Sequence, residues 1–465
     1  MSARPQSLIL WSAVLALVLS STPLYAHGGR PIPRKLYVDP AGQLMAVVSS
    51  DLGLHVTEDG GETWYWICED IIGFDVRDFA LVGEATGDVA GRVWLAGGTG
   101  ITQDEEPVFV PGLYSSTDGG CNWSVVDGGF GGQWASGISV HPGLPNHVVV
   151  TTDHTSMPNG IARSEDGGAS WTWVVADQET KLGTLYRAES DPEVLYASAT
   201  THLLRSDDGG RTWVVWGAEL VEEIIDELAV HAIDPEEPST VYFSLLTGQG
   251  MVLYVTEDAG ATYREILTPS TWEFSAATVL KTDDAGGRMI VAGTLFGDGF
   301  RSTDGGMTWE LYLADVESID CLAPDPSDLG SVWVCSNPFV QILTPGEDVK
   351  AIGRSRDGAE TVEKFFTYAD TDDYRQCAGD SQVETVCVAL LNLSDAGSGD
   401  AADAADVGVE MDLTASPDDA GMDAGMDLSS GAVAPPTGDS CACALGAPSR
   451  GLDMWWRWLG VWRRG

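Results

Sequence analysis

Short turn-like segments of this sequence contain side chains that could transfer protons or bind a polar ligand. Acidic side chains can act as general acids and bases. Four acidic residues lie in such segments: Asp51 (SSDLG), Asp153 (TTDHTS), Glu273 (STWEFS) and Asp298 (LFGDGF). Aromatic and imidazole residues, which stack on rings and form hydrogen bonds, lie there too: Trp134, His154, His202 and Trp272. Each of these residues, taken singly, is more typical of an ordinary solvated loop.

Other chemistries lack their residue patterns in this sequence. No Ser/His/Asp set has a recognisable spacing, no P-loop occurs, and no GxGxxG leads from a strand into a helix. The cysteines show no CxxC or Cys/His spacing for zinc. We therefore expect no metal and no organic cofactor.

The charge balance restricts the partners. The 24 basic and 70 acidic residues give a formal net charge of −46 at pH 7. Nucleic acid and anionic lipid would repel such a chain. We expect no nucleic-acid partner, and the charge is typical of a soluble extracellular domain.

One motif, [S/T]-x-D-x-G-x-[T/S/N]-W, recurs along the chain. Its copies are TEDGGETW (57–64), STDGGCNW (116–123), SEDGGASW (164–171), SDDGGRTW (206–213), TEDAGATY (256–263), STDGGMTW (302–309) and the decayed SRDGAETV (355–362). Their aspartates are Asp59, Asp118, Asp166, Asp208, Asp258, Asp304 and Asp357, at intervals of 59, 48, 42, 50, 46 and 53 residues. A mean of about 50 residues is the size of a four-stranded propeller blade.

The segments between the motifs read as short strands. Apolar runs such as VYFSLL (241–246) and MVLYVT (251–256) precede a motif, and turn residues separate them. No stretch of useful length in the body has helical periodicity. We predict an all-β fold, a seven-bladed β-propeller over residues 27–393, in which each motif joins strands three and four.

The motif has a structural logic. Its Asp can accept hydrogen bonds from backbone N–H groups of the turn, its glycines allow positive φ, and its Trp buries a large ring. One Asp per copy cannot supply the six to eight oxygens that calcium takes. We therefore interpret the seven aspartates as structural. The loops joining strands two and three, and those joining blades, form the opposite face, where we place the candidate site.

These motifs resemble the Asp-box (BNR) repeats of sialidases, sortilin-type receptors, photosystem II assembly factors and xyloglucan-degrading glycosidases, over about residues 30 to 390. The stretch SSDLGLHVTEDGG (49–61) is similar to the one in which xyloglucanase-type enzymes carry a catalytic Asp, here Asp51. In that family the partner carboxylate comes from a second propeller, whereas the seven motifs account for one. The sialidase resemblance implies a converging arginine trio. Four arginines instead precede motifs on third strands: Arg163, Arg205, Arg301 and Arg354.

The two ends of the chain predict export and anchoring. Residues 1–26 read as a signal peptide, with Arg4 before the apolar run Leu8 to Leu19, whose 12 residues are too few to span a bilayer. Residues 394–440, rich in Ala, Gly and Asp, read as a disordered linker. Residues 441–465 resemble a myxobacterial C-terminal sorting signal, with Cys441 or Cys443 at the critical position and a short Trp-rich stretch before Arg463 and Arg464. A tail without an anchoring role is the alternative.

Export permits disulfides among the six body cysteines, which allow 15 pairings. Sequence proximity favours Cys377 with Cys387 and Cys321 with Cys335. The expected function is that of a secreted, surface-tethered, non-catalytic binding module for a glycan or an envelope protein, with the membrane contacted only through the tail. A glycoside hydrolase, xyloglucanase-like more than sialidase-like, is the alternative, and an assembly factor that docks a protein is the third.

Overall fold

A computed structural model describes residues 33–387 of the 465, apart from internal gaps of which the longest are 83–92, 99–111, 217–225 and 337–350. The chain divides into two compact units, Met1–Gly399 and Asp400–Gly465, and all described residues belong to the first. The predicted signal peptide (1–26), linker (394–440) and tail (441–465), with Cys441 and Cys443, lie outside the described residues. Within the described part, no helix has the length and apolar character needed to cross a bilayer.

The described residues form seven sheets, and in each the strands pair in sequence order. The first sheet contains β1 (Pro33–Val38), β2 (Met45–Ser49), β3 (Gly53–Thr57), β4 (Tyr65–Ile67) and the late strand β29 (Asp373–Tyr374). The second contains β5 (Asp78–Val82), β6 (Val93–Gly98), β7 (Gly112–Ser116) and β8 (Ser124–Val125). The third contains β9 (Trp134–His141), β10 (Leu144–Asp153), β11 (Asn159–Ser164) and β12 (Thr172–Gln178).

The other four sheets have four strands each. The fourth contains β13 (Leu182–Arg187), β14 (Leu195–Ala199), β15 (Leu203–Ser206) and β16 (Val214–Trp216). The fifth contains β17 (Asp226–Ile233), β18 (Val241–Thr247), β19 (Gly250–Thr256) and β20 (Arg264–Leu267). The sixth contains β21 (Phe274–Lys281), β22 (Arg288–Thr294), β23 (Gly299–Ser302) and β24 (Glu310–Tyr312). The seventh contains β25 (Cys321–Pro324), β26 (Val332–Cys335), β27 (Ile352–Ser355) and β28 (Glu363–Phe366).

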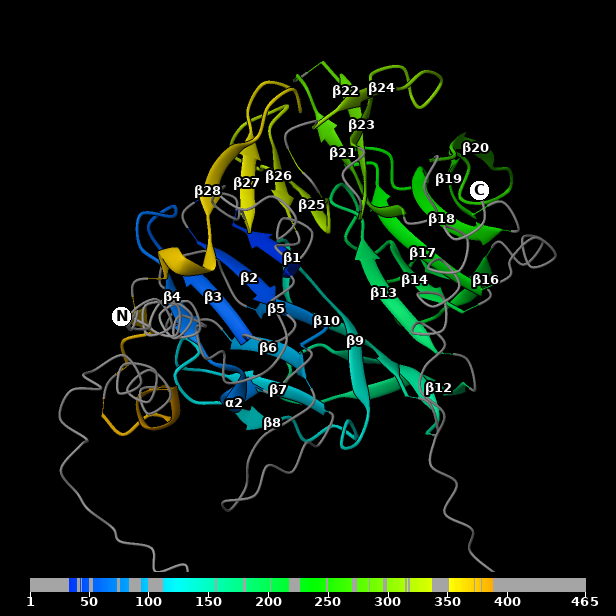
Figure 1. The fold of residues 1–465 in the computed structure, drawn as a ribbon. Coiled ribbons are helices and arrows are strands. Elements are labelled where there is room, and N and C mark those ends of the chain that lie inside the picture. Colours follow the sequence, from blue (N-terminus) through cyan, green and yellow to red (C-terminus); the bar gives the residue numbers. More distant parts are fainter. Residues whose placement is uncertain are drawn as a thin grey trace, which may run out of the picture. The chain divides into compact units, whose positions relative to one another are not determined.

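The sheets follow one another around a common centre (Figure 1). The first strand of each sheet contacts the first strand of the next, and β25 contacts β1, so the contacts return to their starting point. Apolar side chains from neighbouring sheets pack between them, as Tyr242 and Leu253 do with Val279 and Ile290. The predicted all-β propeller is confirmed, and the strands expected at 241–246 and 251–256 are β18 and β19.

The motifs join third and fourth strands as predicted. Between β23 and β24, Asp304 Oδ1 accepts hydrogen bonds from the backbone N–H groups of Met307 (3.0 Å) and Thr308 (2.9 Å). Its Oδ2 accepts one from Thr308 Oγ1 (2.6 Å), and Gly306 N donates to Ser302 Oγ (2.8 Å). The hydroxyl and backbone N–H of Thr308 lower the pKa of Asp304 to about 2, because they stabilise the charged carboxylate.

The glycines of the motif supply the left-handed backbone that its turn requires. Gly305 has φ of 72° and Gly306 has φ of 81°. In the fifth and seventh copies an alanine keeps this conformation, with φ of 56° at Ala259 and 68° at Ala359. Each alanine costs on the order of 1 kcal/mol relative to glycine, because its Cβ crowds the backbone. The turn geometry therefore persists in copies whose sequence has drifted.

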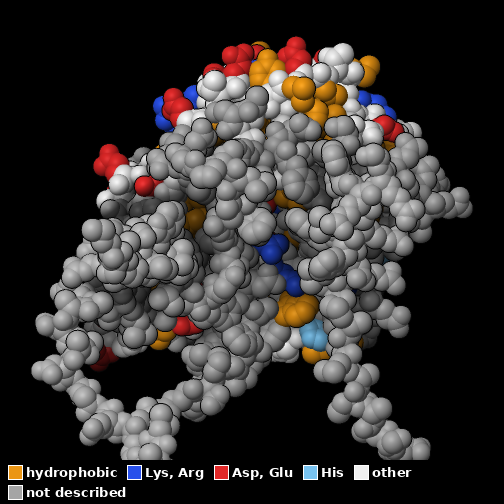
Figure 2. Space-filling view, in the orientation of Figure 1, with side chains coloured by type: hydrophobic (Ala, Val, Ile, Leu, Met, Phe, Trp, Pro, Cys, Tyr) orange, Lys and Arg blue, Asp and Glu red, His pale blue; other side chains and the backbone are white. Residues whose placement is uncertain are grey.

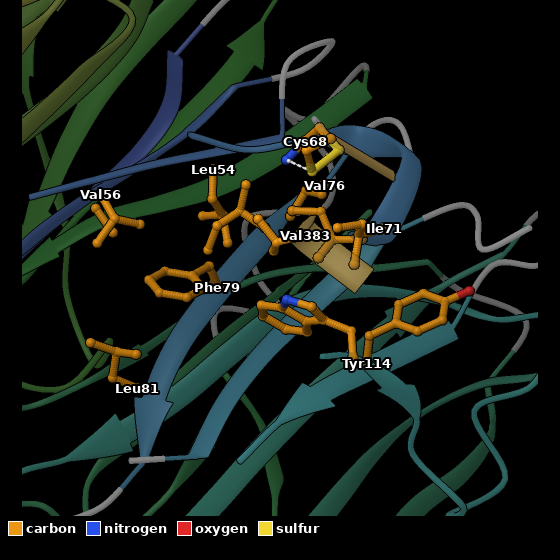
Figure 3. Close-up of a cluster of buried hydrophobic side chains, with 14 of the residues drawn as sticks. Leu54, Val56, Cys68, Ile71, Val76, Phe79, Leu81, Tyr114 and Val383 are labelled. Carbon is orange, nitrogen blue, oxygen red and sulfur yellow. Dashed lines mark hydrogen bonds between the residues drawn. A yellow bond between two sulfur atoms is a disulfide. The ribbon is translucent and has the colours of Figure 1, made fainter. Parts of the chain in front are cut away.

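The segment after the seventh sheet returns to the first two sheets. β29 pairs in parallel with β4, at Asp373↔Tyr65 and Tyr374↔Trp66. The π-helix η5 (Val383–Cys387) packs near the short helix α2 (Glu69–Ile72), and Val383 is fully buried against side chains of the first two sheets (Figure 3). The described part of this segment therefore pairs with the first sheet rather than with the last.

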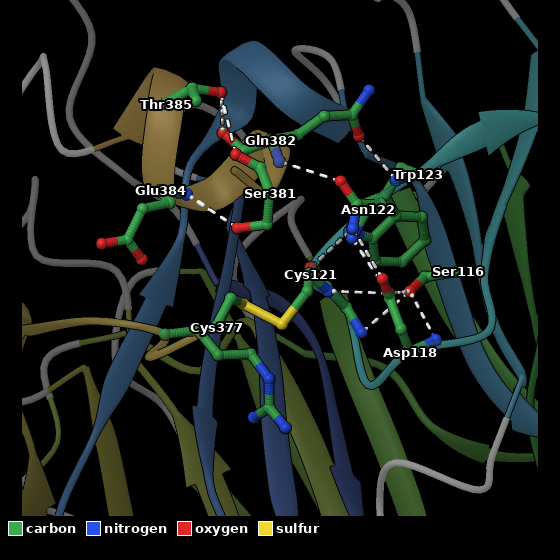
Figure 4. Close-up of a disulfide and its surroundings, with 12 residues drawn as sticks. Ser116, Asp118, Cys121, Asn122, Trp123, Cys377, Ser381, Gln382, Glu384 and Thr385 are labelled. Atoms are coloured by element: carbon green, nitrogen blue, oxygen red, sulfur yellow. Dashed lines mark hydrogen bonds between the residues drawn. A yellow bond between two sulfur atoms is a disulfide. The ribbon is translucent and has the colours of Figure 1, made fainter. Parts of the chain in front are cut away.

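Two disulfides fix this returning segment, which we call the C-terminal clamp (residues 373–387). Cys387 bonds to Cys68 and Cys377 bonds to Cys121, which lies in the second motif (Figure 4). The predicted Cys321–Cys335 bond is confirmed across the β25–β26 pair, where the two residues are register partners. The predicted Cys377–Cys387 bond is wrong. Although the two are ten residues apart, the clamp's fold directs each toward a different sheet.

Candidate functional site

Four of the eight predicted site residues are described: Trp134, Asp153, His154 and His202. Asp51, Trp272, Glu273 and Asp298 lie outside the described residues. Trp134 begins β9 and Asp153 ends β10, and the two are register partners across that strand pair. Strand pairing therefore brings the first three described residues together on the face opposite the motifs.

An arginine that the sequence did not single out completes this group. Arg77 lies immediately before β5, in the connection between the first and second sheets. Its Cζ is 4.4 Å from the centroid of the Trp134 ring, and its Nη1 donates to Asp153 Oδ2 at 2.7 Å. Lys181 Nζ, at the entry to β13, lies 3.7 Å from Asp153 Oδ1. We call Arg77, Trp134, Asp153, His154 and Lys181 the Trp134 cluster.

His154 extends the cluster along the loop after β10. Its ring centroid is 5.5 Å from that of Trp134, with 43° between the ring planes. Its Nδ1 accepts a hydrogen bond from Met157 N (3.0 Å), so in the neutral imidazole Nε2 carries the proton. The Asn159 side chain bonds both the N–H and the carbonyl of His154, at 2.6 Å and 3.1 Å. The loop thus holds an aromatic ring and an imidazole in fixed relation.

The Trp134 ring is not an open stacking platform. Arg77 covers one of its faces, and the ring nitrogen Nε1 is buried without a hydrogen-bond partner among the described residues. A buried N–H that lacks a partner costs on the order of 1–3 kcal/mol. A ligand oxygen that reached this nitrogen would remove that cost. Arg77 therefore occupies one of the two ring faces on which a sugar could stack.

Asp153 is held between two cations. Its side chain is 17% exposed, and Arg77 and Lys181 each face one of its oxygens. Hydrolysis of a glycoside needs a second carboxylate within about 5 to 9.5 Å. Within the Trp134 cluster as described, Asp153 is the single carboxylate. The other three candidate carboxylates, Asp51, Glu273 and Asp298, lie outside the described residues.

Buried polar contacts hold the first strands beneath the cluster. Asp78, whose side chain is 8% exposed, pairs with Lys35 and accepts hydrogen bonds from Phe79 N (2.7 Å) and Ile138 N (2.6 Å). Ser136 Oγ donates to the carbonyl of Leu182 in the fourth sheet. These bonds tie the second sheet to the third and the third to the fourth, which makes the site rigid.

Sequence reasoning missed Lys35, Arg77, Asp78 and Lys181. A usable signal existed for the three basic ones, because basic residues number only 24 and Lys35, Arg77 and Lys181 lie close to the start of first strands. His202 lies before β15 in the fourth sheet, and burial lowers the pKa of its imidazole. Figure 2 shows basic, hydrophobic and histidine side chains next to one another near the centre of the view.

The arginines before the motifs lie on third strands, as predicted, and two of them contact the motif of the next sheet. Arg163 Nε donates to the carbonyl of Gly209 (2.7 Å), and Arg301 Nη1 donates to that of Gly358 (2.6 Å). Arg205 and Arg354 pair with Asp207 and Asp325. The bonds from Arg163 and Arg301 link neighbouring sheets, whereas Arg205 and Arg354 pair with carboxylates of their own sheets. Among the described residues, no group of three or more His, Cys, Asp or Glu is arranged to bind a metal.

Comparison with known proteins agrees with this architecture. The family model for the BNR/Asp-box repeat matches residues 300–311, the sixth motif. An ancestral GH74 enzyme has a similar fold, with a TM-score of 0.55 and 13% identity, over 73% of this chain and 46% of that one. The fold is that of an Asp-box β-propeller. No curated protein sequence matches the chain.

Two further structures extend the comparison. The GH74 xyloglucanase from Xanthomonas campestris has a TM-score of 0.51 and 17% identity. The match covers 71% of this chain and 52% of the xyloglucanase chain. YCF48 from Cyanidioschyzon merolae has a TM-score of 0.43 and 18% identity, and the match covers 66% of this chain and 94% of the YCF48 chain. The chain spans about half the length of the two GH74 structures. At these identities the likeness to the two GH74 structures shows the propeller fold alone.

Proposed function

We propose that this chain is a non-catalytic binding module in which the seven sheets form one seven-bladed ring. The Trp134 cluster binds a glycan or a protein of the cell envelope, and a glycan fits it best. The observation that carries this proposal is the position of Arg77, between the Trp134 ring and Asp153. An aromatic ring edge, a planar guanidinium and a carboxylate together offer the mixed donors and acceptors that hydroxyl-rich ligands use.

We further propose that residues 1–26 direct export and that the tail from Cys441 tethers the protein at the outer surface. The acidic composition and the disulfides support an extracellular setting, since such bonds persist in oxidising compartments. Protease treatment of intact cells should remove the propeller. The Cys441→Ser/Cys443→Ser variant should appear in the medium instead, and equal retention of both proteins on cells would contradict the tether.

The binding proposal is tested with the full chain and a panel of plant, algal and microbial polysaccharides. Retention and released reducing ends are measured together. We expect retention without release, and at least a tenfold weaker affinity for Trp134→Ala, since a central aromatic contact contributes about 1.4 kcal/mol or more. Met307→Ala, on the motif side and 74% exposed, is the matched control and should bind normally. Retention that Trp134→Ala leaves unchanged would remove this cluster from consideration.

The second candidate is a glycoside hydrolase of the xyloglucanase type, which the two GH74 fold matches favour. It would use carboxylates among Asp51, Asp153, Glu273 and Asp298. Release of reducing ends that disappears in Asp51→Asn would establish it and replace the binding-module proposal. If the panel gives neither retention nor release, a protein ligand becomes the case to test, with surface proteins as probes.

A further inference from the structure

A groove on the motif side, between the third and fourth sheets, has features of a second ligand site. Its volume is about 300 Å³. One side of the groove is the last turn of the third sheet together with β12, which contribute Ser170, Thr172 and Val174. The rest of its lining consists of Arg163, Glu165 and Arg211. The motif loops lie on the face opposite the connections that form the Trp134 cluster. The groove is therefore a separate site.

The junction between the third and fourth sheets differs from the other junctions in having two arginines, Arg163 and Arg211. The residue before each motif is Val56, Ser115, Arg163, Arg205, Val255, Arg301 and Arg354, in order. The sixth residue of each motif is Glu62, Cys121, Ala169, Arg211, Ala261, Met307 and Glu360. At one junction of the seven, an arginine before one motif is followed by an arginine at the sixth position of the next motif.

The junction between the sixth and seventh sheets provides a direct comparison. Arg163 donates to the carbonyl of Gly209 and Arg301 to that of Gly358, and both glycines occupy the fourth position of the following motif. The residue two positions after Gly209 is Arg211, and the residue two positions after Gly358 is Glu360. The same scaffold thus places a cation at one junction and an anion at the other.

The geometry shows how the two arginines are satisfied in the absence of a ligand. Glu165 Oε1 pairs with Arg163 Nη1 and lies 3.3 Å from Arg211 Nη2. Arg211 Nη1 also donates to the carbonyl of Asp208 (2.7 Å) and lies 3.4 Å from Glu193. The hydrogen bond from Arg163 lowers the pKa of Glu165. One carboxylate oxygen therefore bridges both guanidinium groups.

Glu165 is a weakly held occupant of this position. Its side chain is 57% exposed, whereas that of Arg163 is 6% exposed. Exposed ion pairs contribute little, because water screens them and the side chain loses freedom. Arg163 is fixed by its bond to Gly209, so the guanidinium stays while the glutamate can rotate into solvent. An incoming oxyanion would meet donors that are already oriented for carboxylate or sulfate geometry.

We propose that this groove binds an acidic sugar residue through its carboxylate or sulfate group. Arg163 and Arg211 hold the oxyanion, and Glu165 occupies its place until the ligand enters. A volume of about 300 Å³ is at the small end of ligand sites and suits one or two sugar rings rather than a protein surface. The Thr172 hydroxyl, which is exposed on β12, offers a partner to ring hydroxyls.

The test is titration calorimetry of the full chain with D-glucuronate, glucose 6-sulfate and glucose. We expect either acidic sugar to bind and glucose not to bind. Arg211→Glu, which copies the junction between the sixth and seventh sheets, should weaken binding at least tenfold. Glu165→Gln should tighten it about three- to tenfold, because the internal competitor loses its charge. Trp134→Ala should leave it unchanged, which separates this site from the proposed glycan site.

Circular dichroism and the thermal midpoint establish that each variant is folded. If Arg211→Glu does not fold, the gain in affinity for Glu165→Gln decides the matter, since a merely structural role for Glu165 predicts no gain. Equal binding of glucose and glucuronate would overturn the proposal. So would unchanged or weaker binding by Glu165→Gln, or binding of poly-glutamate in the absence of binding by either acidic sugar.

Discussion

The C-terminal clamp should contribute a large part of the stability of the propeller. Cys68–Cys387 and Cys121–Cys377 close sequence separations of 319 and 256 residues, whereas Cys321–Cys335 closes 14. In the chain-entropy description, a cross-link stabilises by restricting the unfolded chain, and the effect grows with the logarithm of the loop. The perturbation is replacement of all four clamp cysteines by alanine, compared with Cys321→Ala/Cys335→Ala.

The magnitude follows from the connectivity. The first clamp bond to form closes roughly 300 residues and contributes about 5–6 kcal/mol to the free energy of unfolding. The second clamp bond then closes a smaller loop, which consists of the segments 68–121 and 377–387, and contributes about 4 kcal/mol. Cys321–Cys335 contributes about 3 kcal/mol. Because domains are stable by only about 5–15 kcal/mol, losing both clamp bonds approaches the total.

Urea unfolding followed by tryptophan fluorescence measures the difference, after non-reducing peptide mapping has verified the pairing. We expect the four-cysteine variant to be unfolded or to unfold at the lowest urea concentration. The Cys321→Ala/Cys335→Ala variant should show a moderate shift, and Cys68→Ala/Cys387→Ala should lie between them. Equal midpoints for the four-cysteine and the Cys321/Cys335 variants would refute the reasoning. A mapped Cys377–Cys387 bond would refute its structural premise.

Other consequences are open to measurement. Since hydrogen bonds lower the pKa of Asp304 and Asp166 to about 2, stability present above the unfolded value near 4 should be lost as pH falls toward 2. A urea midpoint that is flat across this window would contradict that. Gly53→Ala should destabilise the folded protein by about 1–3 kcal/mol, because φ at Gly53 is +67° and a Cβ there would lie 2.3 Å from the Ile67 carbonyl oxygen. Thermal unfolding measures the loss. Gly131→Ala is the control, because a Cβ at Gly131 meets nothing within 4 Å. Arg77→Ala should weaken polysaccharide retention more than Arg264→Ala, and an equal effect would argue against the cluster.

The predictions that succeeded rest on local chemistry repeated many times. Each motif encodes its own turn, because its Asp accepts hydrogen bonds from backbone N–H groups and its glycines adopt positive φ. The turn geometry can therefore be predicted from the motif sequence. The spacing of the motifs then leaves room for four strands, and strands of that size can bury their apolar faces only by packing sheet on sheet. Cys321 and Cys335 were predictable because one hairpin places them opposite each other.

The predictions that failed or fell short concern residues distant in sequence. Cys377 and Cys387 are close along the chain, yet η5 and β29 place their side chains against different sheets. Nothing in the sequence places Arg77 beside Trp134 and Asp153, because the three come from separate connections. Periodicity within a strand says which side chains share a face of that strand. It does not say which loop of the neighbouring sheet lies beside them.

The sequence by itself determined the all-β propeller, the places of the turns and the structural role of the seven aspartates, because these depend on interactions within about eight residues. Only the tertiary structure decided which loops converge. It placed Arg77 on Trp134, Glu165 between Arg163 and Arg211, and the clamp against the first two sheets. Those contacts depend on how successive sheets pack around the centre, and a small rotation between neighbours would change all of them.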